Sequence, residues 1–129
     1  MNARLQTRQV LCVDDDVHVL SFLTDALQNE GFQVHTAVDG AHALQKMALR
    51  EPRYDLIIAD ARMPELDGWR LIMQARAAGY RGKIIVFSGY MDEHERQRYR
   101  SLQVDRIIEK PPKRGELIDA IKGVLEIAA

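Results

Sequence analysis

The sequence has a single cysteine and no long apolar run. Cys12 alone excludes a disulfide within the chain and is typical of a reducing compartment. The longest apolar runs are far too short to cross a bilayer, and the first nine residues, MNARLQTRQ, lack the apolar centre of a signal peptide. We therefore expect a cytoplasmic protein that does not associate with a membrane.

An excess of charge of one sign is also lacking. Lys and Arg number 18 and Asp and Glu 19, which gives a formal net charge of −1. This balance offers no polybasic surface, so we expect no direct binding to nucleic acid. Neither GxxxxGK nor GxGxxG follows a strand-like run, which disfavours a nucleotide-binding fold. The 129 residues have an ordinary globular composition, and we expect residues 1–129 to form one domain.

Apolar residues recur in two alternating patterns along the chain. The strand-like runs are residues 10–13, 32–36, 55–60, 83–88 and 106–110. The helix-like segments are residues 17–30, 41–48, 68–78, 92–102 and 117–125. This alternation predicts a parallel sheet that is covered by helices on both faces. Residues 55–60, DLIIAD, are apolar on both faces of the strand, which predicts a central position in the sheet.

Polar side chains stand at the carboxyl ends of four predicted strands. They are Asp14 and Asp15, Asp60, Ser88 and Lys110. In an open parallel sheet, ligands bind outside the carboxyl ends of the strands, at the point where the strand order reverses. If the strand order is 2-1-3-4-5, three carboxylates therefore face one crevice at that point.

Three neighbouring carboxylates repel one another, and their desolvation is costly unless a cation compensates it. Mg²⁺ takes oxygen ligands, and together with Lys110 it would balance the three negative charges. After Asp60, Met63-Pro64 and Asp67-Gly68 predict a rigid turn that presents the backbone carbonyl of Arg62 to the metal.

Asp60 itself can act as a nucleophile toward phosphorus and form an acyl phosphate. Catalysis then depends on positioning and on neutralising the phosphoryl oxygens, for which Mg²⁺, the Lys110 ammonium and the Ser88 hydroxyl are suited.

Four segments carry a resemblance to a known family. VLCVDDD, DLIIADARMPELDG, IIVFSGY and IIEKP, in this order and spacing, resemble the receiver domain of two-component response regulators of the chemotaxis-regulator type. The resemblance covers about residues 8–126. It implies a flavodoxin-like, doubly wound α/β fold with a five-stranded parallel sheet in the order 2-1-3-4-5 and five helices.

The same resemblance implies a function. Asp60 would accept a phosphoryl group from the phosphohistidine of a sensor histidine kinase or a histidine phosphotransfer protein. The reaction would use Mg²⁺, for which Mn²⁺ can substitute, and the phosphorylated domain would control an output partner. Such a domain phosphorylates and dephosphorylates itself and is not a turnover enzyme.

Individual roles follow from the resemblance as well. Asp15 would bind the metal directly and Asp14 through water, while Ser88 would be the switch hydroxyl. The bond from Lys110 to Pro111 would be cis.

Two positions depart from the family pattern. Ile107 stands where strand five usually carries an aromatic residue, so it offers no ring for the usual coupling to the switch hydroxyl. Pro112 follows Pro111 where the family often has Phe, so we expect a stiffer entry to the last helix. The polar segment 92–102 has a thin apolar stripe and is a candidate for a mobile or partner-binding helix.

Two other functions remain open at this point. Haloacid dehalogenase-like phosphatases also combine an Asp nucleophile, a hydroxyl, a lysine and Mg²⁺, but they place DxDx[TV] after the first strand. Here DDDVH puts His18 at the position of Thr or Val, and no cap domain is expected. A degenerate receiver that acts only as a binding module is disfavoured by the full set of five site residues. The sequence leaves open the cognate kinase, the output partner, the oligomeric state and whether the chain is a stand-alone receiver or part of a longer regulator.

Overall fold

Strands and helices alternate along the part of the chain that the computed structural model describes, residues 7–49, 52–63 and 65–127. The strands are β1 (Gln9–Val13), β2 (Gln33–Ala37), β3 (Leu56–Asp60), β4 (Lys83–Ser88) and β5 (Arg106–Glu109). The helices are α1 (Val17–Asn29), α2 (Gly40–Ala48), α3 (Gly68–Ala77), α4 (Glu93–Arg100) and α5 (Arg114–Leu125). All the strand pairs are parallel, and the order in the sheet is β2-β1-β3-β4-β5. The predicted fold class and strand order are confirmed.

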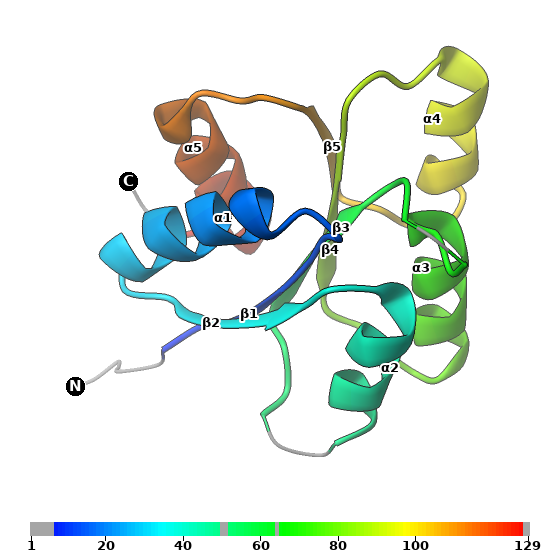
Figure 1. Cartoon of the computed structure of the whole chain (residues 1–129), viewed down its shortest axis with the longest axis horizontal. Coiled ribbons are helices and arrows are strands. Elements are labelled where there is room, and N and C mark those ends of the chain that lie inside the picture. The colour runs from blue at the N-terminus through cyan, green and yellow to red at the C-terminus, as the bar shows by residue number, and fades with distance from the viewer. Residues whose placement is uncertain (1–6, 50–51, 64, 128–129) are drawn as a thin grey trace.

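Helices cover both faces of the sheet (Figure 1). Helices α1 and α5 lie on one face, and α2, α3 and α4 lie on the other. Strand β3 has apolar side chains for both faces of the sheet. Leu56 and Ile58 pack toward α1 and α5, whereas Ile57 packs toward α2 and α3. Every residue of β3 is buried, which confirms its predicted central position.

Aspartate side chains begin four of the helices. Asp16, Asp39, Asp67 and Asp92 each accept a hydrogen bond from a backbone N–H of the first helical turn. These caps satisfy N–H groups that have no partner within the helix. Asp16 is therefore a helix cap, and its role is separate from that of Asp14 and Asp15 just before it.

A few predicted boundaries and one predicted burial differ from the structure. Strand β5 ends at Glu109 rather than at residue 110, and α4 is shorter than the predicted helix 92–102. Val17 belongs to the apolar stripe of α1 in the sequence, yet it is 61% exposed. It is the first residue of α1, directly after the cap Asp16. Within the described residues, no helix has the length and apolar character needed to cross a membrane.

Candidate functional site

The register of the strands brings the predicted site residues to one edge of the sheet. Val13 of β1 pairs with Ala59 of β3, so Asp14 follows β1 beside Asp60, the last residue of β3. Ser88 ends β4 and pairs with Glu109 of β5, and Lys110 follows directly. The Lys110 N–H also donates to the Ser88 carbonyl at 2.7 Å. Segments that are far apart in sequence thus meet at the strand-order reversal between β1 and β3.

Asp14, Asp15 and Asp60 form an acidic cluster at this edge. One carboxylate oxygen from each residue lies within 4.8 Å of the other two. Asp14 is 1% exposed and Asp60 is 6% exposed, whereas Asp15 faces solvent. A donor set that consists only of carboxylate oxygens, with one open side for water, fits a hard divalent cation such as Mg²⁺.

Lys110 links the two buried carboxylates. Its Nζ lies 2.9 Å from Oδ2 of Asp14 and 3.3 Å from Oδ1 of Asp60. Desolvation lowers the pKa of the Lys110 ammonium, but the hydrogen bond to Asp14 and the charge of Asp60 outweigh it, so this pKa lies above its usual value. One ammonium balances one of three carboxylates, and the site keeps an excess of negative charge for a metal cation to balance.

The Asp60 carboxyl is the group most strongly perturbed by this environment. Burial raises its pKa from 3.8 to about 6, and the charge of Asp14 adds to the rise. Lys110 and a long hydrogen bond of 3.4 Å from the Arg62 N–H act in the opposite direction. Asp60 is thus largely ionised near neutral pH, but poorly solvated, which suits a nucleophile that awaits an electrophile.

Ser88 lies at the same edge with an unused hydroxyl. The residue is 1% exposed, and its Oγ has no hydrogen-bond partner within the described residues. A buried hydroxyl without a partner is costly and therefore calls for an explanation. A group bound at Asp60 would supply a hydrogen-bond acceptor for it.

Gly68, the first residue of α3, is required beside Asp60 for a steric reason. A Cβ atom at this position would collide with the carbonyl oxygen of Asp60. The Gly68 N–H donates to the Ala61 carbonyl at 3.1 Å, so the start of α3 packs directly on the backbone that follows Asp60. Pro64 of the predicted turn lies outside the described residues.

The Arg62 side chain forms a strap that the sequence did not indicate. Its Nη2 donates to the carbonyl of Tyr90, at 2.9 Å, and to Oε1 of Glu95 in α4, at 3.1 Å. Arg62 was predicted to contribute only its backbone carbonyl. The strap joins the loop after β3 to the loop after Ser88, and no local pattern indicates a contact between residues so far apart in the chain.

Ile107 and Tyr99 share one apolar cluster beneath α4. Ile107 in β5 is partly buried there, and Tyr99 in α4 is 5% exposed. The Tyr99 hydroxyl donates to the carbonyl of Ala61, at 3.4 Å. Strand β5 thus carries Ile107, and no aromatic ring, at the position where the family usually has one. Tyr99 of α4 contributes a buried ring to the same cluster. The Lys110–Pro111 peptide bond is cis, as the resemblance implies.

Comparisons with known proteins agree with this geometry. A family model described as the response regulator receiver domain matches residues 10–122. The transcriptional regulatory protein PrrA of Mycobacterium leprae is 34% identical over 125 residues, which are 97% of this chain and 53% of PrrA. The chemotaxis protein CheY of Treponema pallidum is 29% identical over 119 residues, covering 92% of this chain and 83% of CheY. The chain spans about half the length of PrrA in three mycobacteria.

A solved structure of a liganded relative has the same fold. The complex of CheX and CheY with BeF₃ and Mg²⁺ from Borrelia burgdorferi superposes with a TM-score of 0.88 and 26% identity. The match covers 96% of this chain and 94% of the matched chain.

Proposed function

The chain belongs to the receiver domain family of two-component response regulators, and from this premise we propose that Asp60 is its phosphoryl-accepting residue. The observation that carries the proposal is the environment of the Asp60 carboxylate at the end of β3. It is buried and lies 3.3 Å from the Lys110 ammonium, and Ser88, at the same edge of the sheet, has a buried hydroxyl with no hydrogen-bond partner among the described residues. We assign the receiver domain to residues 8–126.

Each neighbouring side chain has a role in the transfer. A carboxylate oxygen of Asp60 attacks the phosphorus of a phosphohistidine, forming an O–P bond as the N–P bond breaks, and the imidazole leaves with the electron pair. The Lys110 ammonium neutralises one phosphoryl oxygen, and the Ser88 hydroxyl donates a hydrogen bond to another.

Asp14, Asp15, Asp60 and the Arg62 carbonyl form the proposed Mg²⁺ site. Asp15, which is exposed, would bind the cation directly, and Asp14 would act through water. When bound, the cation supplies positive charge against the phosphoryl oxygens. Mg²⁺ and BeF₃ are part of the related CheX–CheY complex, and the carboxylate cluster in this chain offers the oxygen ligands that Mg²⁺ takes. We propose that Mn²⁺ substitutes for Mg²⁺, because it accepts the same ligands.

Partners follow from this chemistry. The phosphoryl donor is a sensor histidine kinase or a histidine phosphotransfer protein, and an output partner reads the phosphorylated state. We place the domain in the cytoplasm and assign it no direct contact with nucleic acid or membrane. A receiver domain is not a turnover enzyme; self-phosphorylation and autodephosphorylation at Asp60 are part of the proposal. The haloacid dehalogenase-like reading is set aside, because the family match spans residues 10–122. The hypothesis of a degenerate receiver predicts that the wild-type protein is not labelled in the following experiment.

Intact-mass measurement after incubation with acetyl phosphate and Mg²⁺ tests the assignment. The wild-type protein should gain the mass of one phosphoryl group, and Asp60→Asn should gain none, because an amide is not a nucleophile toward phosphorus. Asp55→Asn is the matched control, since Asp55 lies just before β3 at the opposite edge of the sheet and should leave labelling unchanged. Chelation of the metal should prevent labelling, and Mn²⁺ should restore it. Labelling of Asp60→Asn at another residue, or an unlabelled wild-type protein, would refute the proposal.

A further inference from the structure

Helix α4 has little packing of its own. Of its eight residues, Glu93–Arg100, only Tyr99 is buried. Its remaining side chains are polar, with acids in the first turn and bases in the last, which complements the helix dipole. A helix with one buried side chain depends on a few specific contacts for its position. The residues that make these contacts with α4 are therefore the ones that can change its position.

One contact joins Tyr99 to the residue that follows Asp60. The Ala61 carbonyl accepts the Tyr99 hydroxyl at 3.4 Å and the Gly68 N–H at 3.1 Å. The Ala61 N–H in turn donates to the Phe87 carbonyl, one residue before Ser88. The Tyr99 hydroxyl therefore bonds to the backbone that directly follows Asp60 and is itself bonded to the residue before Ser88. At 3.4 Å the hydroxyl bond is long for an O–H donor, so a small displacement ends it.

A second contact involves the next residue, Arg62. Its guanidinium bonds to the Tyr90 carbonyl and to Glu95 of α4, and 60% of its side chain is exposed. Tyr90 follows Ser88 by two residues. A shift of Ser88 toward a group on Asp60 would therefore displace Tyr90 and disturb the Arg62 contacts that join this loop to the first half of α4.

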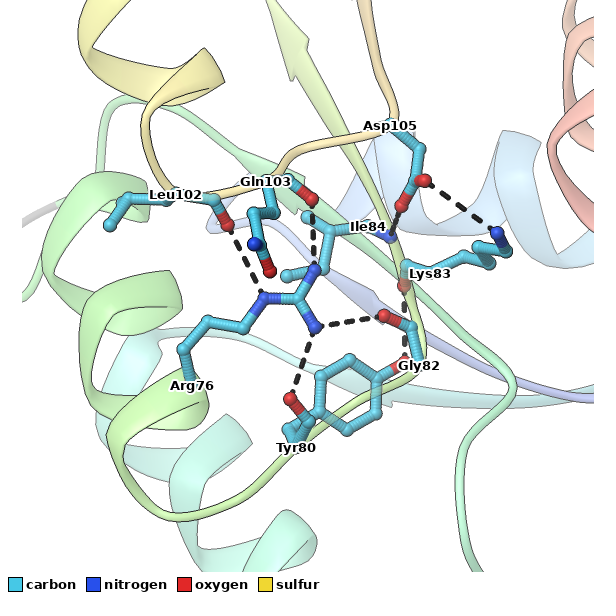
Figure 2. A network of polar contacts seen from close by, with 8 residues as sticks. All are labelled: Arg76, Tyr80, Gly82, Lys83, Ile84, Leu102, Gln103 and Asp105. Atoms are coloured by element: carbon cyan, nitrogen blue, oxygen red, sulfur yellow. Dashed lines mark hydrogen bonds and ion pairs between the residues drawn. The ribbon is translucent and has the colours of Figure 1, made fainter.

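The opposite end of α4 is firmly anchored (Figure 2). The Arg76 guanidinium donates to the carbonyls of Leu102 and Gln103, just beyond α4, at 3.3 and 2.9 Å. It also donates to the carbonyls of Tyr80 and Gly82, before β4, both at 3.0 Å. Since this clamp holds Leu102 and Gln103, α4 can only pivot about these residues, and the Tyr99 side chain moves with the helix. A cleft of about 220 Å³ between α3 and α4, lined in part by Ala61, Arg62 and Tyr99, provides space for this motion.

We propose, on the basis of the function proposed above, that Tyr99 is the positioning residue that couples Asp60 to α4. Its hydroxyl bond to Ala61 holds α4 in the arrangement of the unphosphorylated domain and is lost when Asp60 is phosphorylated. Ile107 has no polar atom in its side chain and cannot form an equivalent bond. A contact present in only one of two states shifts their populations by its own free energy.

The variant Tyr99→Phe tests this role because it keeps the ring and removes the hydroxyl. Without the bond, the inactive arrangement loses stability, so apparent affinity for beryllofluoride in the presence of Mg²⁺ should rise by about two- to fivefold. Hydrogen exchange across residues 93–102 should be faster in the free variant than in the free wild-type protein. The addition of beryllofluoride should then change exchange in α4 less than it does in the wild-type protein.

Tyr80→Phe is the matched control. The Tyr80 hydroxyl donates to the Lys83 carbonyl, at 3.1 Å, at the edge of the sheet away from Asp60. Its loss should lower stability without altering beryllofluoride affinity. If Tyr99→Phe binds beryllofluoride with unchanged or weaker affinity, or if Tyr80→Phe shows the same gain, the coupling role is wrong. A wild-type protein that neither binds beryllofluoride nor changes exchange at residues 88–91 would instead refute the proposed function, and with it this inference.

Discussion

Strand β3 has an aspartate at each end, and the two carboxylates have opposite environments. Asp55, just before the strand, accepts the Gln9 N–H at 2.7 Å and is partly open to solvent. Asp60, the last residue, is buried beside Asp14, and its pKa is raised to about 6. The Asp55 carboxylate satisfies a backbone N–H group. The Asp60 carboxylate is desolvated and lies beside the charge of Asp14, and this costs free energy until a ligand binds. The two edges of the sheet differ in the same way.

The cations of the two edges extend this comparison. Arg76 of α3 donates to four backbone carbonyls beside the amino end of β4 (Figure 2). Lys110, at the carboxyl edge, serves two buried carboxylates and lies near a hydroxyl, that of Ser88, with no partner in the described residues. A satisfied polar network contributes stability, whereas unsatisfied groups and repelling charges in a native structure mark a functional site.

The largest stability effect is expected at the amino edge. Arg76→Ala leaves four carbonyls without their donor, and water replaces it only in part, so the free energy of unfolding should fall by about 2–3 kcal/mol. Phosphoryl labelling of the folded variant should equal that of wild type, because the network lies away from Asp60. Urea denaturation and intact mass measure the two quantities, with the exposed neighbour Arg81→Ala as control. A labelling defect in Arg76→Ala would show that the two edges are not independent.

A smaller effect of opposite sign is expected at the carboxyl edge. Because the pKa of Asp60 is raised from 3.8 to about 6 on folding, the folded state binds more protons between these values, and stability falls as pH rises through this range. Above pH about 6 the full cost is present, and Asp60→Asn should stabilise the metal-free protein by about 1–2 kcal/mol.

The pH dependence separates this cause from a general effect of the amide. Asp60→Asn should flatten the stability profile between pH about 4 and about 6. Asp55→Asn, which weakens a charge-assisted bond, should lower stability by about 0.5–1 kcal/mol. Urea denaturation across pH measures both variants. A destabilised Asp60→Asn protein at neutral pH would mean that attraction from Lys110 exceeds the cost of burial.

The sequence predicted the carboxyl edge far better than the amino edge. Asp60, Ser88 and Lys110 each stand at the end of an apolar strand, and the rules of parallel sheets place such positions together. The contacts of Arg76 are made to backbone carbonyls, which carry no residue identity, so no pattern in the sequence points to them. The Arg62 strap and the Tyr99 hydroxyl bond join residues 28 to 38 positions apart through long side chains, and their partners depend on the final packing.

Burial of individual helix residues was likewise only partly predictable. Periodicity correctly identifies Leu20, Leu23 and Leu27 as part of the buried stripe of α1, but it also includes Val17, the first residue of the helix, which is exposed. The thin stripe of α4 is also present in the structure, as Met91 before the helix and Tyr99 within it are buried. Periodicity reports the direction of a side chain and not whether another element lies there.

Hydrogen exchange of the wild-type protein with and without Mg²⁺ and beryllofluoride tests the central claim most directly. Our account predicts the largest change across residues 88–102, where the loop after Ser88 and helix α4 respond to the group on Asp60. Residues 105–109, which include Ile107, should change much less, and residues 76–84, held by Arg76, should not change. A change at 105–109 or 76–84 that equals or exceeds that at 88–102 would contradict the account.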